Sequence, residues 1–250
     1  MSGHSRWANI KRVKGAADAK RGRIFTKLVK EITVAARIGG GNPDGNPRLR
    51  LAIETARAEA MPKDNIERAI KKGTGELEGE AYVEVLYEGY GPHGVALLIE
   101  CATDNKNRTV SELRNILDKA NGSLGTQNSV AYKFHRKGRI AVPKKSTTED
   151  KLTELVIEAG GEDVVDGGDV FNVLTTVEDF NTVRDNLAKA KVEIAQAELT
   201  YVPAMNVMLS GKDAEQVLSL IDKLEDNEDV QKVHADMEIS EEDLARLAGS

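Results

Sequence analysis

The sequence is poor in several residue types, and each shortage argues against a class of protein. Its 250 residues contain one cysteine, Cys101, which excludes an intramolecular disulfide and a cysteine-rich zinc site. Its longest apolar runs, such as Val95–Ile99, are far shorter than a membrane span. The four histidines lie far apart, without the paired spacing of zinc ligands. We therefore expect no metal and no membrane partner. Because the N-terminus is polar and basic rather than apolar, we expect no secretory signal and a cytoplasmic location.

Motifs for nucleotide-dependent and acyl-transfer enzymes are also missing. Gly89–Gly94 fits the dinucleotide-binding spacing GxGxxG, but a strand pattern follows it where a helix N-terminus would be needed, so we expect a hairpin turn. There is no complete P-loop and no Gly-x-Ser-x-Gly elbow. We expect no catalytic residue, no cofactor and no small-molecule substrate. An enzyme using Asp104, Asn105, Asn107 and Arg108 is the alternative, although these residues more simply form the loop before a helix.

What the chain does have is a strong separation of charge. Residues 1–75 hold 17 Lys and Arg against 7 Asp and Glu, a net charge of +10, while the whole chain has a formal charge of −6. Residues 76–250 therefore carry −16, from 18 basic and 34 acidic residues. Such a division predicts an N-terminal region that binds polyanions and an acidic body.

The N-terminal cations also share one side of a predicted helix. From Ile24 to Ala36 the apolar residues recur at helical spacing, and the cations fall on the opposite side of the predicted helix. This pattern is typical of a helix that follows a nucleic-acid backbone, where each neutralised phosphate releases a counterion. Trp7 either stacks on a base or sugar or anchors the N-terminal arm. The residues predicted to bind nucleic acid are Arg6, Trp7, Lys11, Arg12, Lys14, Lys20, Arg21, Arg23, Lys27 and Lys30.

Two acidic runs, Glu225–Asp229 and Glu241–Asp243, qualify this interpretation. We expect them to be solvated surface. The alternative is that they restrain the basic region intramolecularly. A scaffold whose acidic body binds basic partners is a further functional alternative.

The predicted fold is α+β: an N-terminal helical bundle followed by two ferredoxin-like α/β domains, the second inserted into the first. Residues 2–19 read as an arm that orders on binding. Helices are expected near 20–38 and 48–60, and a third is expected from Pro62 to the glycine at 73. The predicted domains are residues 1–78, residues 79–138 plus 204–250, and residues 139–203.

The body alternates strand and helix patterns. Strands are expected at 82–87, 95–103 and 129–134, with a helix opening at the capping box Thr109–Glu112 and a turn at 136–138. Residues 139–202 read as βαββαβ, the ferredoxin-like order. A last strand–helix–strand, 205–209, 213–224 and 230–236, is too small to fold alone and is expected to complete the domain begun at 79. The alternative is two successive domains with this last unit packed elsewhere.

The βαββαβ order is also that of an RNA-recognition module. Its inner strands offer only Phe171 as a stacking aromatic and contain no RNP-like run. The sequence therefore gives this comparison little support.

Several motifs resemble those of the YebC family. They are Ser2–Lys11, Arg23–Leu28, Ala35–Gly40, Met61–Gly73, Tyr87–Gly94, Thr103–Thr109 and Ser129–Gly138. The resemblance covers nearly the whole chain and implies three domains, the third inserted in the second. It also implies a cytoplasmic, DNA-binding transcriptional regulator, while related members described as translation factors act at the ribosome. We therefore expect a non-enzymatic regulator of gene expression that binds DNA or, alternatively, ribosomal RNA and the ribosome. Its oligomeric state is not predicted.

Overall fold

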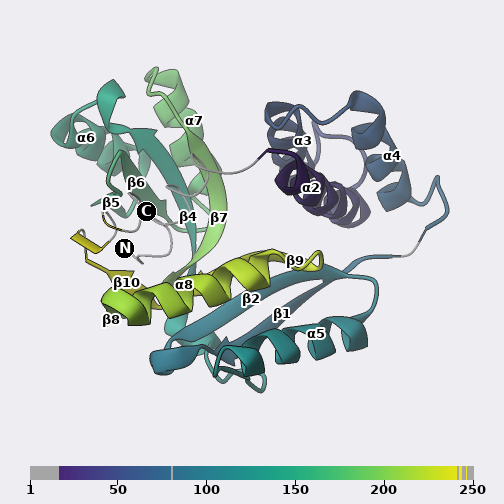
Figure 1. The fold of residues 1–250 in the computed structure, drawn as a ribbon. Helices are drawn as coiled ribbons and strands as arrows, with labels where there is room; N and C mark the ends of the chain where they lie inside the picture. Colours follow the sequence, from purple (N-terminus) through teal and green to yellow (C-terminus); the bar gives the residue numbers. More distant parts are fainter. Residues whose placement is uncertain (1–16, 80, 241, 244–245, 247–250) are drawn as a thin grey trace. The chain divides into compact units, whose positions relative to one another are not determined.

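The computed structural model describes residues 17–79, 81–240, 242–243 and 246 (Figure 1). The described residues form two compact units, one from residues 17–129 and 215–233 and the other from residues 130–214 and 234 onward. Helices and antiparallel sheets are both present, and the predicted α+β class is confirmed. The expected domain boundaries at 78, 138 and 203 remain a prediction.

The first unit begins with three helices, as predicted. They are α2 (Ala17–Gly39), α3 (Pro47–Ala58) and α4 (Lys63–Thr74), and they surround a small core (Figure 1). Helix α2 starts three residues before the predicted position, so residues 17–19 of the expected arm are helical, while residues 2–16 lie outside the described residues. The core consists of Ile32, Ala35, Ala36, Leu49, Ala52, Ile53, Ala56, Met61, Ile66 and Ala69.

The loop between α2 and α3 is held by one asparagine. The Asn46 side chain accepts a hydrogen bond from the backbone N–H of Leu49 at 3.1 Å and so caps α3. Its amide donates to the carbonyl oxygens of Ala35 and Gly40, both at 2.8 Å. Asn46 therefore satisfies backbone groups at the end of one helix and at the start of the next.

A four-stranded sheet completes this unit. Its strand order is β3 (Ser123–Leu124), β1 (Val83–Tyr90), β2 (Ala96–Thr103) and β9 (Val230–Ala235). The unit also contains helix α5 (Lys106–Lys119) and most of helix α8 (Gly211–Glu225). Strand β9 comes from the far end of the chain, so the sheet is discontinuous in sequence, as predicted. The GxGxxG segment is a hairpin turn, because Gly91 N–H donates to the Val95 carbonyl at 2.8 Å between the antiparallel strands β1 and β2.

The second unit contains the inserted sheet. Its order is β5 (Asp163–Asp166), β6 (Val170–Thr175), β4 (Phe134–Pro143) and β7 (Gln196–Pro203), with every neighbour antiparallel. Helices α6 (Glu149–Ala159) and α7 (Phe180–Lys189) share one core with these strands, so both cover the same face (Figure 1). This is the ferredoxin-like arrangement that the βαββαβ order predicts.

Two local predictions around β4 are wrong. Residues 129–134 are not a strand; β3 lies earlier and residues Ala131–Lys133 form a 3₁₀ turn. The expected turn at 136–138 lies inside β4, where Gly138 lets Thr175 and Phe180 approach the backbone too closely for any side chain.

Further errors concern α5 and the last strands. Helix α5 begins at Lys106 with Asn105 as its cap, not at the Thr109 box. The expected strand 205–209 is β8 (Val207–Leu209), which pairs in parallel with β10 (Met237–Ile239) instead of joining the discontinuous sheet. The expected strand 230–236 is confirmed as β9, and the short strand β10, which was not predicted, follows it after Asp236.

The one cysteine is part of the core. Cys101 is buried in β2, and burial raises the pKa of its thiol to about 12, with the nearby Asp229 carboxylate adding to the rise. A thiol of this kind is unreactive at neutral pH. No helix in the described ranges has both the length and the apolar character that a membrane crossing requires.

The packing of α4 on α2 generates a test with a matched control. A Cβ at Gly73 would press on the Thr33 carbonyl oxygen and lie 2.7 Å from the Ala36 Cβ. We expect Gly73→Ala to lower the free energy of unfolding by about 1–3 kcal/mol, because the helices must move apart. Gly22→Ala, at a helical position where a Cβ would meet nothing within 4 Å beyond its own helix backbone, should instead stabilise by about 0.5–1 kcal/mol. Urea denaturation of both variants measures this, and equal effects would contradict the packing argument.

Candidate nucleic-acid interface

The residues predicted to bind nucleic acid fall into two groups. Arg6, Trp7, Lys11, Arg12 and Lys14 lie outside the described residues. Lys20 and Arg21 belong to the first turns of α2, but their side chains lie outside what the structure describes. Arg23, Lys27 and Lys30 remain, and the structure shows what each of them contacts.

All three cations face the loop between α8 and β9. The Arg23 guanidinium forms an ion pair with Asp226 at 2.8 Å, and both side chains are substantially exposed. The Lys27 amine donates to the Glu225 carbonyl oxygen at 2.7 Å. The Lys30 amine donates to the Glu228 carbonyl oxygen at 2.8 Å and to the Asp229 carboxylate at 2.7 Å. The acidic run Glu225–Asp229 therefore restrains the basic helix, which is the alternative to the solvated surface that we expected.

Lys30 does not lie on an exposed cationic face, and this part of the sequence prediction is wrong. Only 5% of the residue is exposed. Helical periodicity separates apolar residues from polar ones, but it does not show that a polar side is covered by another part of the chain. In this conformation the amine is used within the protein and does not reach a phosphate.

Asp229 is the centre of this contact. Besides Lys30, its carboxylate accepts hydrogen bonds from the Thr103 hydroxyl at 3.1 Å, the Thr109 hydroxyl at 2.8 Å and the Arg108 guanidinium at 2.9 Å. Burial by itself would raise the pKa of Asp229, but the hydrogen bonds from Lys30, Arg108 and Thr109 outweigh it and lower the pKa to about 2. Helix α2, strand β2, helix α5 and strand β9 thus meet at one ionised carboxylate.

The same cluster explains the polar residues of the loop Asp104–Arg108, which the sequence offered as an alternative enzyme site. Asn105 caps α5 by accepting from the Arg108 backbone N–H at 3.1 Å. The Arg108 side chain pairs with Asp104 at 2.7 Å as well as with Asp229, and these carboxylates raise its pKa. These contacts support the interpretation as the start of a helix. Within the described ranges no group of three or more His, Cys, Asp and Glu side chains is arranged to hold a metal ion.

A second ionic contact joins the helices to β1. Arg48 of α3 pairs with Glu31 of α2 at 2.8 Å and with Glu84 of β1 at 2.5 Å. The side-chain hydrogen bond to Glu84 is the largest cause of a raised pKa for Arg48, which stays charged. Sequence reasoning missed this residue, because alternating charges on a helix do not reveal their partners.

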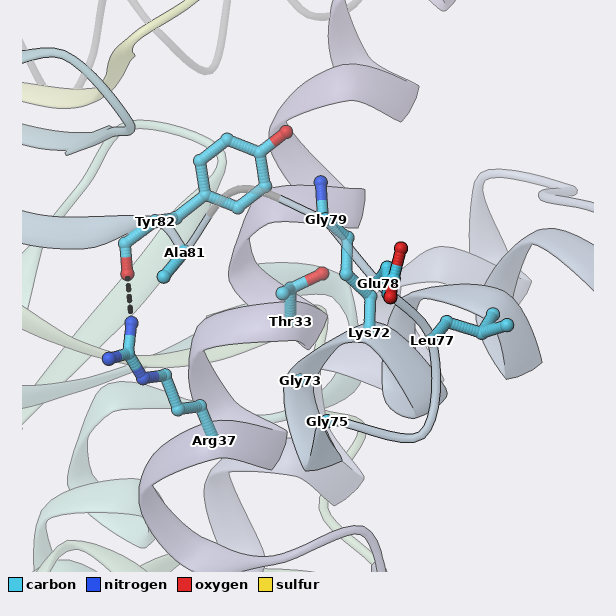
Figure 2. A pocket seen from close by; sticks show the side chains of 10 residues that line it. All are labelled: Thr33, Arg37, Lys72, Gly73, Gly75, Leu77, Glu78, Gly79, Ala81 and Tyr82. Atoms are coloured by element: carbon cyan, nitrogen blue, oxygen red, sulfur yellow. Dashed lines mark hydrogen bonds between the residues drawn. The ribbon is translucent and has the colours of Figure 1, made fainter.

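A hollow of about 420 Å³ lies where the segment after α4 passes α2 (Figure 2). Figure 2 shows two cations near Tyr82: the Arg37 guanidinium donates to its carbonyl oxygen at 3.3 Å, and the Lys72 amine lies 4.6 Å from the centre of its ring. Both cations hold the Tyr82 segment in place. The lining residues are Thr33, Arg37, Lys72, Gly73, Gly75, Leu77, Glu78, Gly79, Ala81 and Tyr82.

The inserted sheet does not use Phe171 as a stacking surface. Phe171 is 6% exposed and belongs to the core under α6 and α7, and the Lys144 amine lies 5.2 Å from its ring centre. Bases therefore have no access to this ring, although the topology is that of an RNA-recognition module.

Asp229 generates a prediction about acid stability. Its pKa is about 2 in the folded protein and 3.8 in an unfolded one, so its ionised form stabilises the fold at pH above about 4 and this contribution is lost as the pH falls toward 2. The shift corresponds to about 2 kcal/mol. Asp229→Asn should cost more, about 3–5 kcal/mol at pH 7, because it leaves the buried Lys30 amine without a counter-charge.

The measurement is urea unfolding of both proteins at pH 7 and pH 3. We expect the difference between wild type and Asp229→Asn to be smaller at pH 3. Asp226→Asn, which removes only the exposed pair with Arg23, is the control and should cost less than about 1 kcal/mol. A pH-independent difference would show that the Asp229 charge does not stabilise the fold.

Comparison with known proteins places the chain in a family. Residues 5–76 match the model of the TACO1/YebC protein N-terminal domain, and residues 82–237 match that of the TACO1/YebC second and third domain. Probable transcriptional regulatory proteins of Desulforapulum autotrophicum and Geobacter sulfurreducens are 55% and 56% identical to it. The first match covers 97% of this chain and 98% of the relative, and the second covers 99% and 100%.

A solved structure agrees with these matches. The crystal structure of a conserved hypothetical protein from Aquifex aeolicus is similar with a TM-score of 0.83 and 49% identity, over 91% of this chain and 94% of that one. The structural match and the two family models together extend over most of the sequence. The chain belongs to the TACO1/YebC family, and the relatives that it matches over nearly their whole length are named probable transcriptional regulatory proteins.

Proposed function

We propose that the protein is a non-enzymatic regulator of gene expression in the cytoplasm that binds nucleic acid, in the first place DNA, through the cations of its N-terminal region. The observation that carries the proposal is the net charge of +10 in residues 1–75 of a chain whose remainder carries −16. Relatives that match over nearly the whole length are named probable transcriptional regulatory proteins. Both observations favour a polyanionic partner.

The contacts of α2 narrow the residues that serve this role. Lys30 is buried against Asp229, so we leave it out of the proposed interface. Arg23 is 40% exposed in its pair with Asp226, so it can reach a phosphate without unfolding the buried cluster. The proposed contacts are therefore Arg6, Lys11, Arg12, Lys14, Lys20, Arg21 and Arg23, with Lys27 contributing when it leaves the Glu225 carbonyl, and with Trp7 stacking beside them.

Salt dependence tests the proposal. A variant with Arg6, Lys11, Arg12 and Lys14 changed to Gln should bind a mixed-sequence DNA duplex at least tenfold more weakly at about 50 mM salt. Its logarithmic salt slope should be shallower by about 0.9 for each phosphate that is no longer neutralised. Fluorescence anisotropy across a salt series measures both quantities.

The matched control removes four cations elsewhere: Lys151, Lys189, Lys191 and Lys212 changed to Gln, all exposed. If the control lowers affinity and salt slope as much as the N-terminal variant, only net charge matters and the proposed interface is wrong. A parallel titration with ribosomes tests the alternative partner, ribosomal RNA. Tighter binding to ribosomes than to duplex DNA at high salt would replace the transcriptional proposal with a translational one. Crosslinking in cells, followed by sequencing of bound DNA and RNA, identifies the target itself.

A further inference from the structure

The acidic body contains a long cationic stretch without Asp or Glu. Residues 125–148 hold six Lys and Arg and no Asp or Glu, in a part of the chain that otherwise carries a large negative charge. Strand β4 makes up ten of these residues and lies inside the inserted sheet. A cationic strand in an acidic body requires an explanation. The contacts of its cations provide most of that explanation.

Carboxylates from neighbouring segments neutralise five of the six cations. The pairs are Lys133–Asp236 at 3.0 Å, Lys137–Glu162 at 2.6 Å, Arg139–Glu198, Lys144–Asp166 at 2.7 Å and Lys145–Glu193 at 3.5 Å. Arg136 is exposed and has no carboxylate partner among the described residues. The next residue along the strand toward the N-terminus, His135, is also exposed. Within the described part of the chain, the strand thus presents one unpaired guanidinium to solvent.

An exposed aromatic ring lies four residues before Arg136. Tyr132 is 71% exposed, whereas the other aromatic side chains that the structure describes are buried or half-buried. The backbone beneath it is held firmly, because Val130 and Phe134 on either side are buried and Lys133 N–H donates to the Val130 carbonyl at 2.9 Å. A ring fixed in this way meets a ligand without first ordering its own backbone.

Two methionines extend the apolar surface. The Ala204 N–H donates to the Lys133 carbonyl at 2.8 Å, and Phe134 pairs with Pro203 in the β4–β7 ladder, so residues 203–205 run beside residues 132–134. Met205, the next residue, is 82% exposed, and Met208 in β8 is 64% exposed. An aromatic ring, two thioether side chains and an unpaired guanidinium therefore lie on adjoining segments of one unit.

We propose that Tyr132, Met205, Met208 and Arg136 form a platform for single-stranded nucleic acid, with a base stacked on Tyr132 and the adjacent phosphate on Arg136. Aromatic side chains beside cations are the usual means of holding unpaired bases, and stacking tolerates any base. The charge favours this occupant, because the exposed Arg136 guanidinium has no carboxylate partner among the described residues. A double helix keeps its bases stacked inside and offers nothing to Tyr132. The inference rests on the proposed nucleic-acid function, and it adds a second contact remote in sequence from the N-terminal cations.

Comparing single strands with duplex tests the platform. Fluorescence anisotropy would measure binding of the full chain to a labelled mixed-sequence single-stranded RNA, the same sequence as DNA, and the DNA duplex. Tyr132→Ala should weaken binding to single strands by about 5- to 150-fold, the value of one stacked base, and should leave duplex binding unchanged. Tyr132→Phe keeps the ring and should retain wild-type affinity. Arg136→Gln should reduce the salt slope for single strands by about 0.7.

Ile157→Ala is the matched control, because Ile157 is an equally exposed apolar residue on α6 of the same unit, at 70%. It should change nothing. A photo-crosslink from 5-bromouridine RNA to the peptide containing Tyr132 or Met205 gives an independent readout. Comparing the affinities for single-stranded RNA and single-stranded DNA shows whether the platform distinguishes ribose from deoxyribose.

Failure of the platform is distinct from failure of the proposed function. The platform is overturned if Tyr132→Ala binds single strands as wild type does, if it weakens duplex binding equally, or if wild type binds no single strand. It is also overturned if Tyr132→Ala changes only self-association in analytical ultracentrifugation, which would make the surface a protein interface. Weaker duplex binding by the N-terminal Gln variant, alongside any of these results, would leave the proposed function intact.

Discussion

The first compact unit depends on one buried carboxylate. Asp229 directly precedes β9 and accepts hydrogen bonds from α2, β2 and α5. Residues far apart in sequence therefore meet at a single charge. A buried ion is costly unless its partners satisfy it, and here two cations and two hydroxyls do so. The result is a geometric requirement: α2 lies where the Lys30 amine reaches Asp229.

This requirement changes the meaning of the basic helix. In the sequence the cations of α2 look like one exposed surface, but in the structure they differ in how deeply they are buried. Lys30 at the buried end serves the fold, while Arg23 at the exposed end forms a pair that solvent and salt weaken. Charge separation along the chain therefore contributes to the fold itself, because Lys30 and Asp229 come from its basic and acidic parts.

Sequence patterns predict the helices and strands better than the contacts between them. The three N-terminal helices, the βαββαβ unit and the discontinuous sheet follow from periodicity and turn residues, which act locally. The Lys30–Asp229 pair joins residues 199 positions apart, and no local pattern encodes it. The turn predicted at Gly138 is wrong because a glycine that admits Phe180 and a glycine that reverses the chain look alike in sequence. Exposure of Tyr132 also depends on tertiary packing, so only the structure reveals it.

The loop after α8 binds the lysines mainly through its main chain. Lys27 and the first bond of Lys30 end on the carbonyl oxygens of Glu225 and Glu228, which every amino acid possesses. The side chains at these two positions are thus replaceable without breaking these hydrogen bonds. Loop length is not, because deleting one residue between Glu225 and Asp229 would move the carbonyls and the carboxylate out of register with a rigid helix. These hydrogen bonds therefore constrain the spacing of positions 225 and 228 and not their side chains, whereas at Asp229 the position and the carboxylate both matter.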